Sequence, residues 1–134
     1  MTEQIANLKA GDVLEAKLEQ VTRMDLIKYS GASGDFNPIH TIDEEAKNAG
    51  LPGIIARGML TMGNLTKLFT PFYEEGFLQD YKIRFAGMVF LGDVLTLQAV
   101  VEEQMEDHVD FNVRVLNQKE KEVIKGSARF IKTN

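Results

Sequence analysis

The sequence contains no cysteine and only two histidines among its 134 residues. The absence of cysteine excludes disulfide bonds and thiolate chemistry. Histidine is the side chain whose ordinary pKa lies closest to neutral pH, so this chain has few groups suited to proton transfer there. One of these few groups is His40.

Long apolar runs are also absent, and no stretch is long enough to span a bilayer. Residues 1–7 lack the basic region and apolar run of a signal peptide. We therefore expect a cytosolic protein.

A concentrated basic segment is missing as well. The net charge is -5, the pI is about 5.0 and no Lys/Arg cluster is visible along the chain. Because phosphate binding needs a basic face, we expect no nucleic-acid partner. With 44% hydrophobic and 26% charged residues, the composition is that of a globular protein, and we expect one domain over residues 1–134.

The first half of the chain carries one strand pattern and several helix patterns. Residues 14–19 alternate between apolar and charged side chains, which predicts a strand. Thr22 begins a predicted helix that ends in the Gly/Ser-rich segment 30–34, and residues 43–50 predict a short surface helix. Residues 59–72 carry apolar side chains at helical spacing and form the most apolar helix candidate.

The second half is dominated by period-two alternation. Apolar and polar side chains alternate over residues 81–85, 95–101, 109–115 and 123–132, which predicts four strands with short connections. One early strand, central helices and a final meander indicate an α+β domain in which the apolar helix packs on an antiparallel sheet.

An acid, an amide, a proline and an imidazole are concentrated in residues 35–40. Pro38 restricts both its own backbone and that of Asn37, so the loop is expected to be stiff. A stiff loop can hold Asp35 and His40 in a fixed relation, and such a pair can orient one water and move its protons. The same residue types also form ordinary turns, so the residues alone leave a purely structural role open.

Two segments together carry a family resemblance. Residues 29–40 read Tyr-Ser-Gly-Ala-Ser-Gly-Asp-Phe-Asn-Pro-Ile-His, and residues 53–63 read Gly-Ile-Ile-Ala-Arg-Gly-Met-Leu-Thr-Met-Gly. With Ala46 between them, they closely resemble the MaoC-like dehydratases and (R)-specific enoyl-CoA hydratases. The resemblance covers most of the chain and implies a single hotdog domain, in which an antiparallel sheet wraps a long apolar helix.

The resemblance also implies roles for individual residues. Asp35 and His40 would be the catalytic pair that holds the water, with Asn37 and Ser33 supporting their loop. The backbone N–H of Gly58 would donate to the thioester carbonyl oxygen, where enolate charge develops. No metal or other cofactor is expected, and acyl-CoA or an acyl carrier protein thioester would be the substrate.

The chain departs from the family pattern at Arg57, where family members commonly carry histidine. An arginine there could meet a carbonyl or a CoA phosphate, although a single arginine more often points to solvent. Met59 and Met62 are candidate substrate contacts, and such apolar stripes also form ordinary core. His108 is expected to be a solvated turn residue.

We therefore expect a hotdog homodimer, with the pocket at the interface, that hydrates trans-2-enoyl thioesters to (R)-3-hydroxyacyl thioesters or catalyses the reverse dehydration. The alternatives are a hotdog thioesterase and a non-catalytic acyl-CoA-binding or regulatory subunit. Lys82 and Arg84 could attract CoA phosphates, or they could simply form a solvated strand face.

Overall fold

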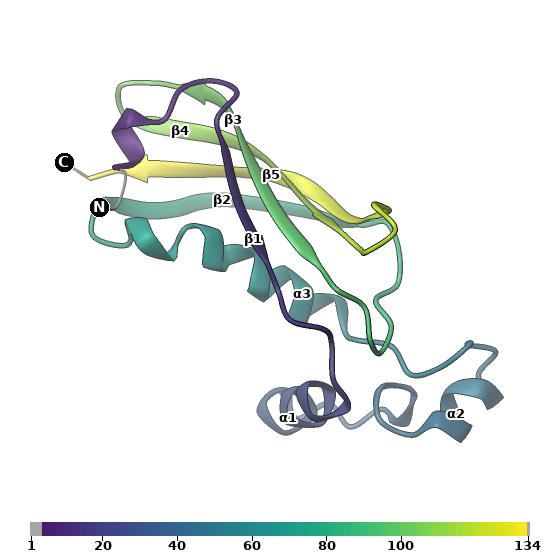
Figure 1. Cartoon of the computed structure of the whole chain (residues 1–134). Coiled ribbons are helices and arrows are strands. Elements are labelled where there is room, and N and C mark those ends of the chain that lie inside the picture. The colour runs from purple at the N-terminus through teal and green to yellow at the C-terminus, as the bar shows by residue number, and fades with distance from the viewer. Residues whose placement is uncertain (1–3, 134) are drawn as a thin grey trace.

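A five-stranded antiparallel sheet forms the body of the protein in the computed structural model, which describes residues 4–133 (Figure 1). All five strands predicted from the sequence are present, and the α+β class is confirmed. Their order across the sheet is β1-β3-β4-β5-β2. The strands are β1 (Val13–Lys17), β2 (Gly76–Phe85), β3 (Thr96–Gln104), β4 (His108–Leu116) and β5 (Glu122–Lys132).

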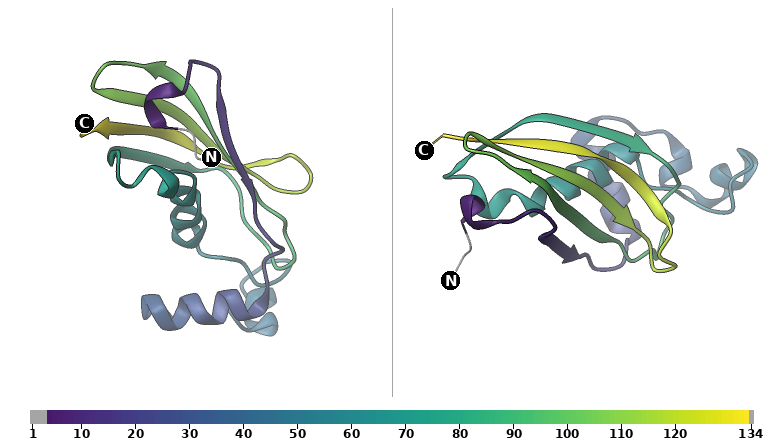
Figure 2. Two further views of the ribbon diagram at one scale, coloured as in Figure 1. Left: turned by 60° about the vertical axis from the view of Figure 1, so that its left-hand side comes forward. Right: turned by 90° about the horizontal axis from the view of Figure 1, so that it is seen from above.

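The two faces of this sheet differ in polarity, as expected for an antiparallel sheet with one covered face. Along β4, alternate residues are nearly fully buried, and those between them are exposed or half-buried. The buried face meets the apolar segment that follows α3 (Gly58–Leu65), where the ring of Phe69 lies edge-on to Phe111 with centroids 5.0 Å apart. The main core therefore lies between this segment and the sheet (Figure 2).

The predicted long apolar helix is shorter than expected. α3 ends at Leu65, and two 3₁₀ turns follow, Thr66–Leu68 and Thr70–Phe72. Pro71 explains part of this interruption, since it lacks an N–H donor and disfavours helical backbone at the residue before it. The apolar side chains at Leu65 and Phe72 are nevertheless buried, so the helical spacing correctly predicted which face meets the sheet.

Two further helices lie near the N-terminal end of α3, away from the sheet (Figure 1). In α1 (Arg23–Ser33), Thr22 forms the predicted capping box with Asp25, and the helix ends at Gly34 in the left-handed conformation, with φ 73°. α2 (Asp43–Asn48) follows a short loop. A second, small cluster joins these helices through the buried side chains of Leu26, Ala46 and Ile54.

The prediction that His108 is a solvated turn residue is wrong. His108 is the first residue of β4, and its side chain is only 16% exposed. Its imidazole lies between two carboxylates, with Nδ1 2.6 Å from Asp107 Oδ1 and Nε2 3.6 Å from Asp110 Oδ2.

Among residues 4–133, no helix is long and apolar enough to cross a membrane.

Candidate active site

The loop between α1 and α2 is held by its own side chains. Asn37 caps a 3₁₀ turn at Pro38–His40, where its Oδ1 accepts the Ile39 N–H at 3.2 Å. The Asn37 N–H in turn donates to Asp35 Oδ1 at 3.1 Å. Ser33 Oγ accepts the Asp35 N–H at 3.3 Å. These bonds fix the backbone on both sides of the carboxylate, which is the supporting geometry expected for Asn37 and Ser33.

His40 is buried, with 8% of the residue exposed, and its orientation is set by one main-chain carbonyl. Its Nδ1 lies 2.7 Å from the carbonyl oxygen of Ile55. Because a carbonyl can only accept, Nδ1 carries a proton in this contact, and in the neutral ring Nε2 is left as an acceptor.

Arg57 does not point to solvent, so that expectation is wrong. Only 9% of its side chain is exposed, and its Nε donates to Asp35 Oδ2 at 3.0 Å. Nη1 donates to Ser30 Oγ at 3.0 Å, and Nη2 donates to the Asp35 carbonyl oxygen. The guanidinium carbon also lies 5.9 Å from the centre of the Tyr29 ring. A buried arginine needs such partners, and here three hydrogen bonds and an aromatic ring supply them.

Asp35 is thereby kept ionised. The hydrogen bond from Arg57 is the main cause that holds the pKa of this carboxyl below its ordinary value of 3.8, with the Asn37 N–H adding to it. The Asp35 side chain is 55% exposed, so the carboxylate has solvent on one side and the guanidinium on the other. Near neutral pH it is an acceptor and an electrostatic partner, not a proton donor.

Gly58 is the first residue of α3, and the N–H groups of a first helical turn have no partner within the helix. The helix dipole makes this end favourable for negative charge. A Cβ at position 58 would lie 2.7 Å from the ring of Phe85, so this position requires glycine unless the ring moves. Next to it, Met59 is exposed and Met62 is half-buried, so neither belongs to the fully buried core.

A single short segment, residues 55–58, connects these groups. The carbonyl of Ile55 holds His40, the side chain of Arg57 holds Asp35, and Gly58 begins α3. The segment is itself held against the connection between β2 and β3, where Ile55 forms an isolated bridge with Phe90. The structure therefore brings together residues 35–40 and the start of α3, as the resemblance implied.

Three contributors to this arrangement were not assigned by sequence reasoning. Tyr29 and Ser30 lie in the last turns of α1 and receive the guanidinium of Arg57. Both belong to the segment that carries the family resemblance, but neither was assigned a role. The carbonyl of Ile55 was also missed, and no side-chain pattern could have identified it because its role belongs to the backbone.

Two cavities lie beside the start of α3. One, of about 660 Å³, separates α1 from α3 and has an apolar side that includes Leu60 and Leu95 and a charged side that includes Asp25 and Lys28. The other, of about 290 Å³, is lined by Gly58 together with Met59, Phe85 and Met88. Both offer apolar space next to a helix N-terminus, which suits a ligand with an apolar chain and a polar acceptor.

Comparisons with known proteins agree with this arrangement. The chain is 40% identical over 78 residues to the fatty acid synthase subunit beta of Aspergillus oryzae, covering 56% of this chain but only 4% of that protein. It is 27% identical over 132 residues to the mitochondrial 3-hydroxyacyl-acyl-carrier-protein dehydratase of Arabidopsis thaliana, covering 95% of this chain and 79% of that protein.

Among solved structures, the chain resembles the unliganded (R)-hydratase PhaJ1 of Pseudomonas aeruginosa, with a TM-score of 0.87 and 28% identity over 95% of this chain and 83% of that chain. This likeness confirms the hotdog fold. Residues 6–123 match the MaoC-like domain, and the protein therefore belongs to the MaoC-like hydratase and dehydratase family.

Proposed function

We propose that this protein adds water to trans-2-enoyl thioesters to give (R)-3-hydroxyacyl thioesters, or removes it in the reverse direction. The observation that carries the proposal is the convergence on residues 55–58 of a buried imidazole with an available Nε2, an ionised carboxylate and a helix N-terminus. This reaction needs a base, an acceptor that orients the water and a donor to the developing oxyanion, and these three groups can fill those roles in that order.

In the hydration direction, His40 Nε2 takes a proton from a water that the Asp35 carboxylate orients. The water oxygen bonds to the β-carbon, and the π electrons of the double bond move toward the thioester carbonyl oxygen. The Gly58 N–H donates to that oxygen, assisted by the dipole of α3. A proton then passes from the imidazolium to the α-carbon, so the net change is the addition of one water.

Arg57 is a positioning residue in this proposal. It touches neither the water nor the thioester; its Nε fixes the rotamer and charge of Asp35 through the hydrogen bond to Oδ2. Its own position is held by hydrogen bonds to Ser30 Oγ and to the Asp35 carbonyl oxygen. Its burial and its hydrogen bonds to Asp35 and Ser30 do not support contact with a CoA phosphate in this chain.

The (R)-hydratase among the solved structures supports the hydratase form of the proposal, and the plant dehydratase supports a carrier-protein thioester as an alternative substrate. We further propose that the protein is a homodimer, that it acts in the cytosol and that it needs no cofactor. Dimerisation is supported by the free edge of β2, where the side chains of Phe77 and Phe85 are each about half exposed.

The deciding experiment mixes purified protein with crotonyl-CoA, follows the loss of the conjugated enoyl absorbance, and determines the chirality of the product. We expect (R)-3-hydroxybutyryl-CoA. Asp35→Asn and His40→Gln should each lower the rate by about 10²- to 10⁴-fold while the circular dichroism spectrum stays that of the wild type. Wild-type rates in either variant would contradict the assigned roles.

The same assay separates the alternatives. Release of a free CoA thiol without hydration would indicate a thioesterase. Tight binding of crotonyl-CoA with neither reaction would indicate a binding or regulatory subunit.

A further inference from the structure

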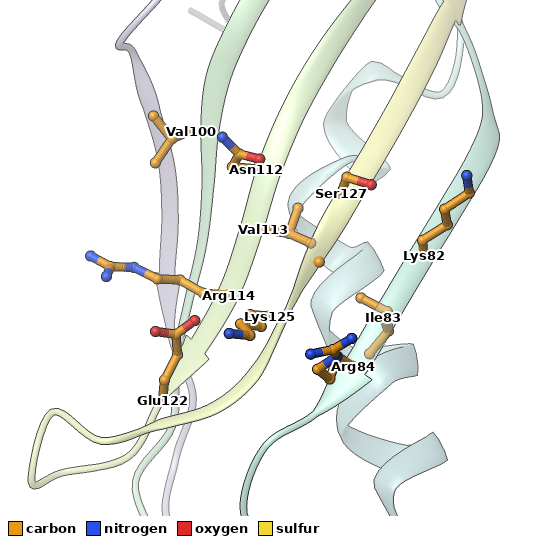
Figure 3. Close-up of a pocket in the computed structure, with 11 residues that line it drawn as sticks. Lys82, Ile83, Arg84, Val100, Asn112, Val113, Arg114, Glu122, Lys125 and Ser127 are labelled. Atoms are coloured by element: carbon orange, nitrogen blue, oxygen red, sulfur yellow. The ribbon is translucent and has the colours of Figure 1, made fainter.

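The outer face of the sheet carries a row of positive charge that the sequence does not reveal. Arg84 on β2 lies directly opposite Lys125 on β5, and Lys125 lies directly opposite Arg114 on β4. Lys82 lies two residues from Arg84 on the same face of β2. Figure 3 shows Arg114, Lys125 and Arg84 side by side across the three strands. We call these four residues the basic row.

This arrangement is unfavourable for the isolated chain. Like charges directly opposite each other on neighbouring strands destabilise a sheet. Within residues 4–133, none of the four forms an ion pair with a carboxylate, and Arg114 donates only to the side-chain oxygen of Gln98, at 2.6 Å. By contrast, Arg129 on the same strand as Lys125 is paired with Asp110 at 2.8 Å. The basic row is thus uncompensated in a chain whose net charge is -5.

The row borders an open groove of about 720 Å³. Between the charged side chains, its outward-facing floor holds the shorter side chains of Asn112, Ser127 and Val100. No aromatic side chain lines it, so it offers no stacking platform for a nucleotide base. Glu122 is the one acidic residue in the lining. The groove therefore suits an anionic ligand that is already folded and has no nucleotide base to be recognised.

The groove is separate from the candidate active site. Side chains alternate between the two faces of a strand, and Phe85 on β2 points toward Gly58. Arg84 must then point to the opposite face, so the sheet lies between the basic row and the proposed thioester site. This placement does not support the idea that Lys82 and Arg84 hold the phosphates of a CoA bound to the same chain.

We infer that the basic row is a docking surface for an acidic helix of a partner protein. Three neighbouring strands set the charges of Arg84, Lys125 and Arg114 over about 10 Å. Carboxylates at positions i, i+4 and i+7 of an α-helix lie on one face and span about the same length. Such a helix matches both the spacing of the row and its charge, and occupancy would remove the like-charge repulsion across the strands.

The test uses the whole protein and two fluorescent helical peptides of identical composition. One carries Glu at i, i+4 and i+7, and the other has the same residues rearranged around the helix. We expect the first to bind, with affinity falling as salt is added, and the second to bind about tenfold more weakly. Equal binding of the two peptides, or binding of neither, would overturn the proposal.

The variant Arg84→Gln/Arg114→Gln/Lys125→Gln should lose about tenfold or more in affinity for the first peptide. Its matched control, Lys9→Gln/Lys28→Gln/Lys47→Gln, removes the same charge from exposed lysines outside the sheet and should bind as the wild type does. An equal loss in both variants would show attraction by net charge alone. Tighter binding of a single-stranded oligonucleotide than of the peptide would favour nucleic acid and reject the acidic helix.

Discussion

At the scale of single residues, Arg57 decides how the candidate site is charged. A histidine at this position would have one or two ring donors, whereas the guanidinium reaches Ser30 and both the carboxylate and the carbonyl of Asp35 at once. The consequence is a carboxyl whose pKa lies below 3.8 although it is largely exposed. In the proposed mechanism, proton transfer then falls to His40, and Asp35 orients the water.

The first prediction concerns this contact. Arg57→Gln removes the main cause of the lowered pKa, so the pKa of Asp35 should rise toward 3.8 and its ionised form should be lost at a higher pH than in the wild type. An NMR titration of the Asp35 carboxyl carbon measures this shift. Because the carboxylate also loses its fixed rotamer, hydration should slow by about 10²-fold.

Arg57→Lys keeps the positive charge but loses the planar guanidinium. It should therefore preserve the lowered pKa of Asp35 better than it preserves the rate of hydration. Arg23→Gln is the control, since Arg23 forms an exposed ion pair with Asp43 at 2.9 Å. An unchanged Asp35 titration in Arg57→Gln would show that the guanidinium does not govern this carboxyl.

At the scale of elements, the N-terminus of α3 is where the helix, the edge of the sheet and the loop of residues 35–40 meet. The helix begins against the ring of Phe85 at the end of β2, and this contact is close enough that position 58 has no room for a side chain. The other glycine of the helix, Gly63, has no atom within 4 Å of the place where a Cβ would lie. The contact with Phe85 therefore requires glycine at position 58, whereas no such contact requires it at position 63.

The second prediction compares these two positions. Gly58→Ala should push the Phe85 ring away from the helix start and slow hydration, because the proposed oxyanion donor shifts with it. Gly63→Ala should leave the rate unchanged and raise the free energy of unfolding by about 0.5–1 kcal/mol, since glycine is unfavourable inside a helix. Urea unfolding and the crotonyl-CoA assay measure both. Equal rates in the two variants would count against a role for the helix start.

At the scale of the whole molecule, the two edges of the sheet are unequal. β1 (Val13–Lys17) is short, whereas β2 (Gly76–Phe85) is twice as long and its outer side has no neighbouring strand within residues 4–133. A long free edge with exposed apolar side chains invites pairing with another strand. β2 also ends beside Gly58, so pairing there would enclose the candidate site.

The third prediction follows from this asymmetry. Phe77→Lys on β2 should weaken the proposed dimer by about 100-fold or more, because it places a charge on each side of the same two-fold interface. Val13→Lys introduces the same charge at a half-exposed position on the opposite edge and should leave the dimer intact. Sedimentation velocity across a range of protein concentrations measures both. Dissociation by the Val13 variant alone would place the interface on β1.

Much of the fold could be predicted because its signals are local. Alternation located every strand, although β2 begins at Gly76, five residues before the predicted start at Tyr81. Thr22 and Asp25 correctly predicted the start of α1 through a capping box. The length of α3 was harder to predict, because apolar side chains keep their helical spacing past Pro71 although the α-helix itself ends at Leu65. His108 was misplaced because three residues at a hairpin carry too little pattern to locate the start of a strand.

The sequence by itself determined the element order, the buried faces and the concentration of Asp35, Asn37 and His40 in one loop, since each depends on neighbours along the chain. Only the tertiary structure decided that Arg57 is buried on Asp35 and that Ile55 holds His40. It also decided that cations distant in sequence form one row on the sheet. These are contacts between distant segments, and their partners are selected by packing and strand register, which no local pattern encodes.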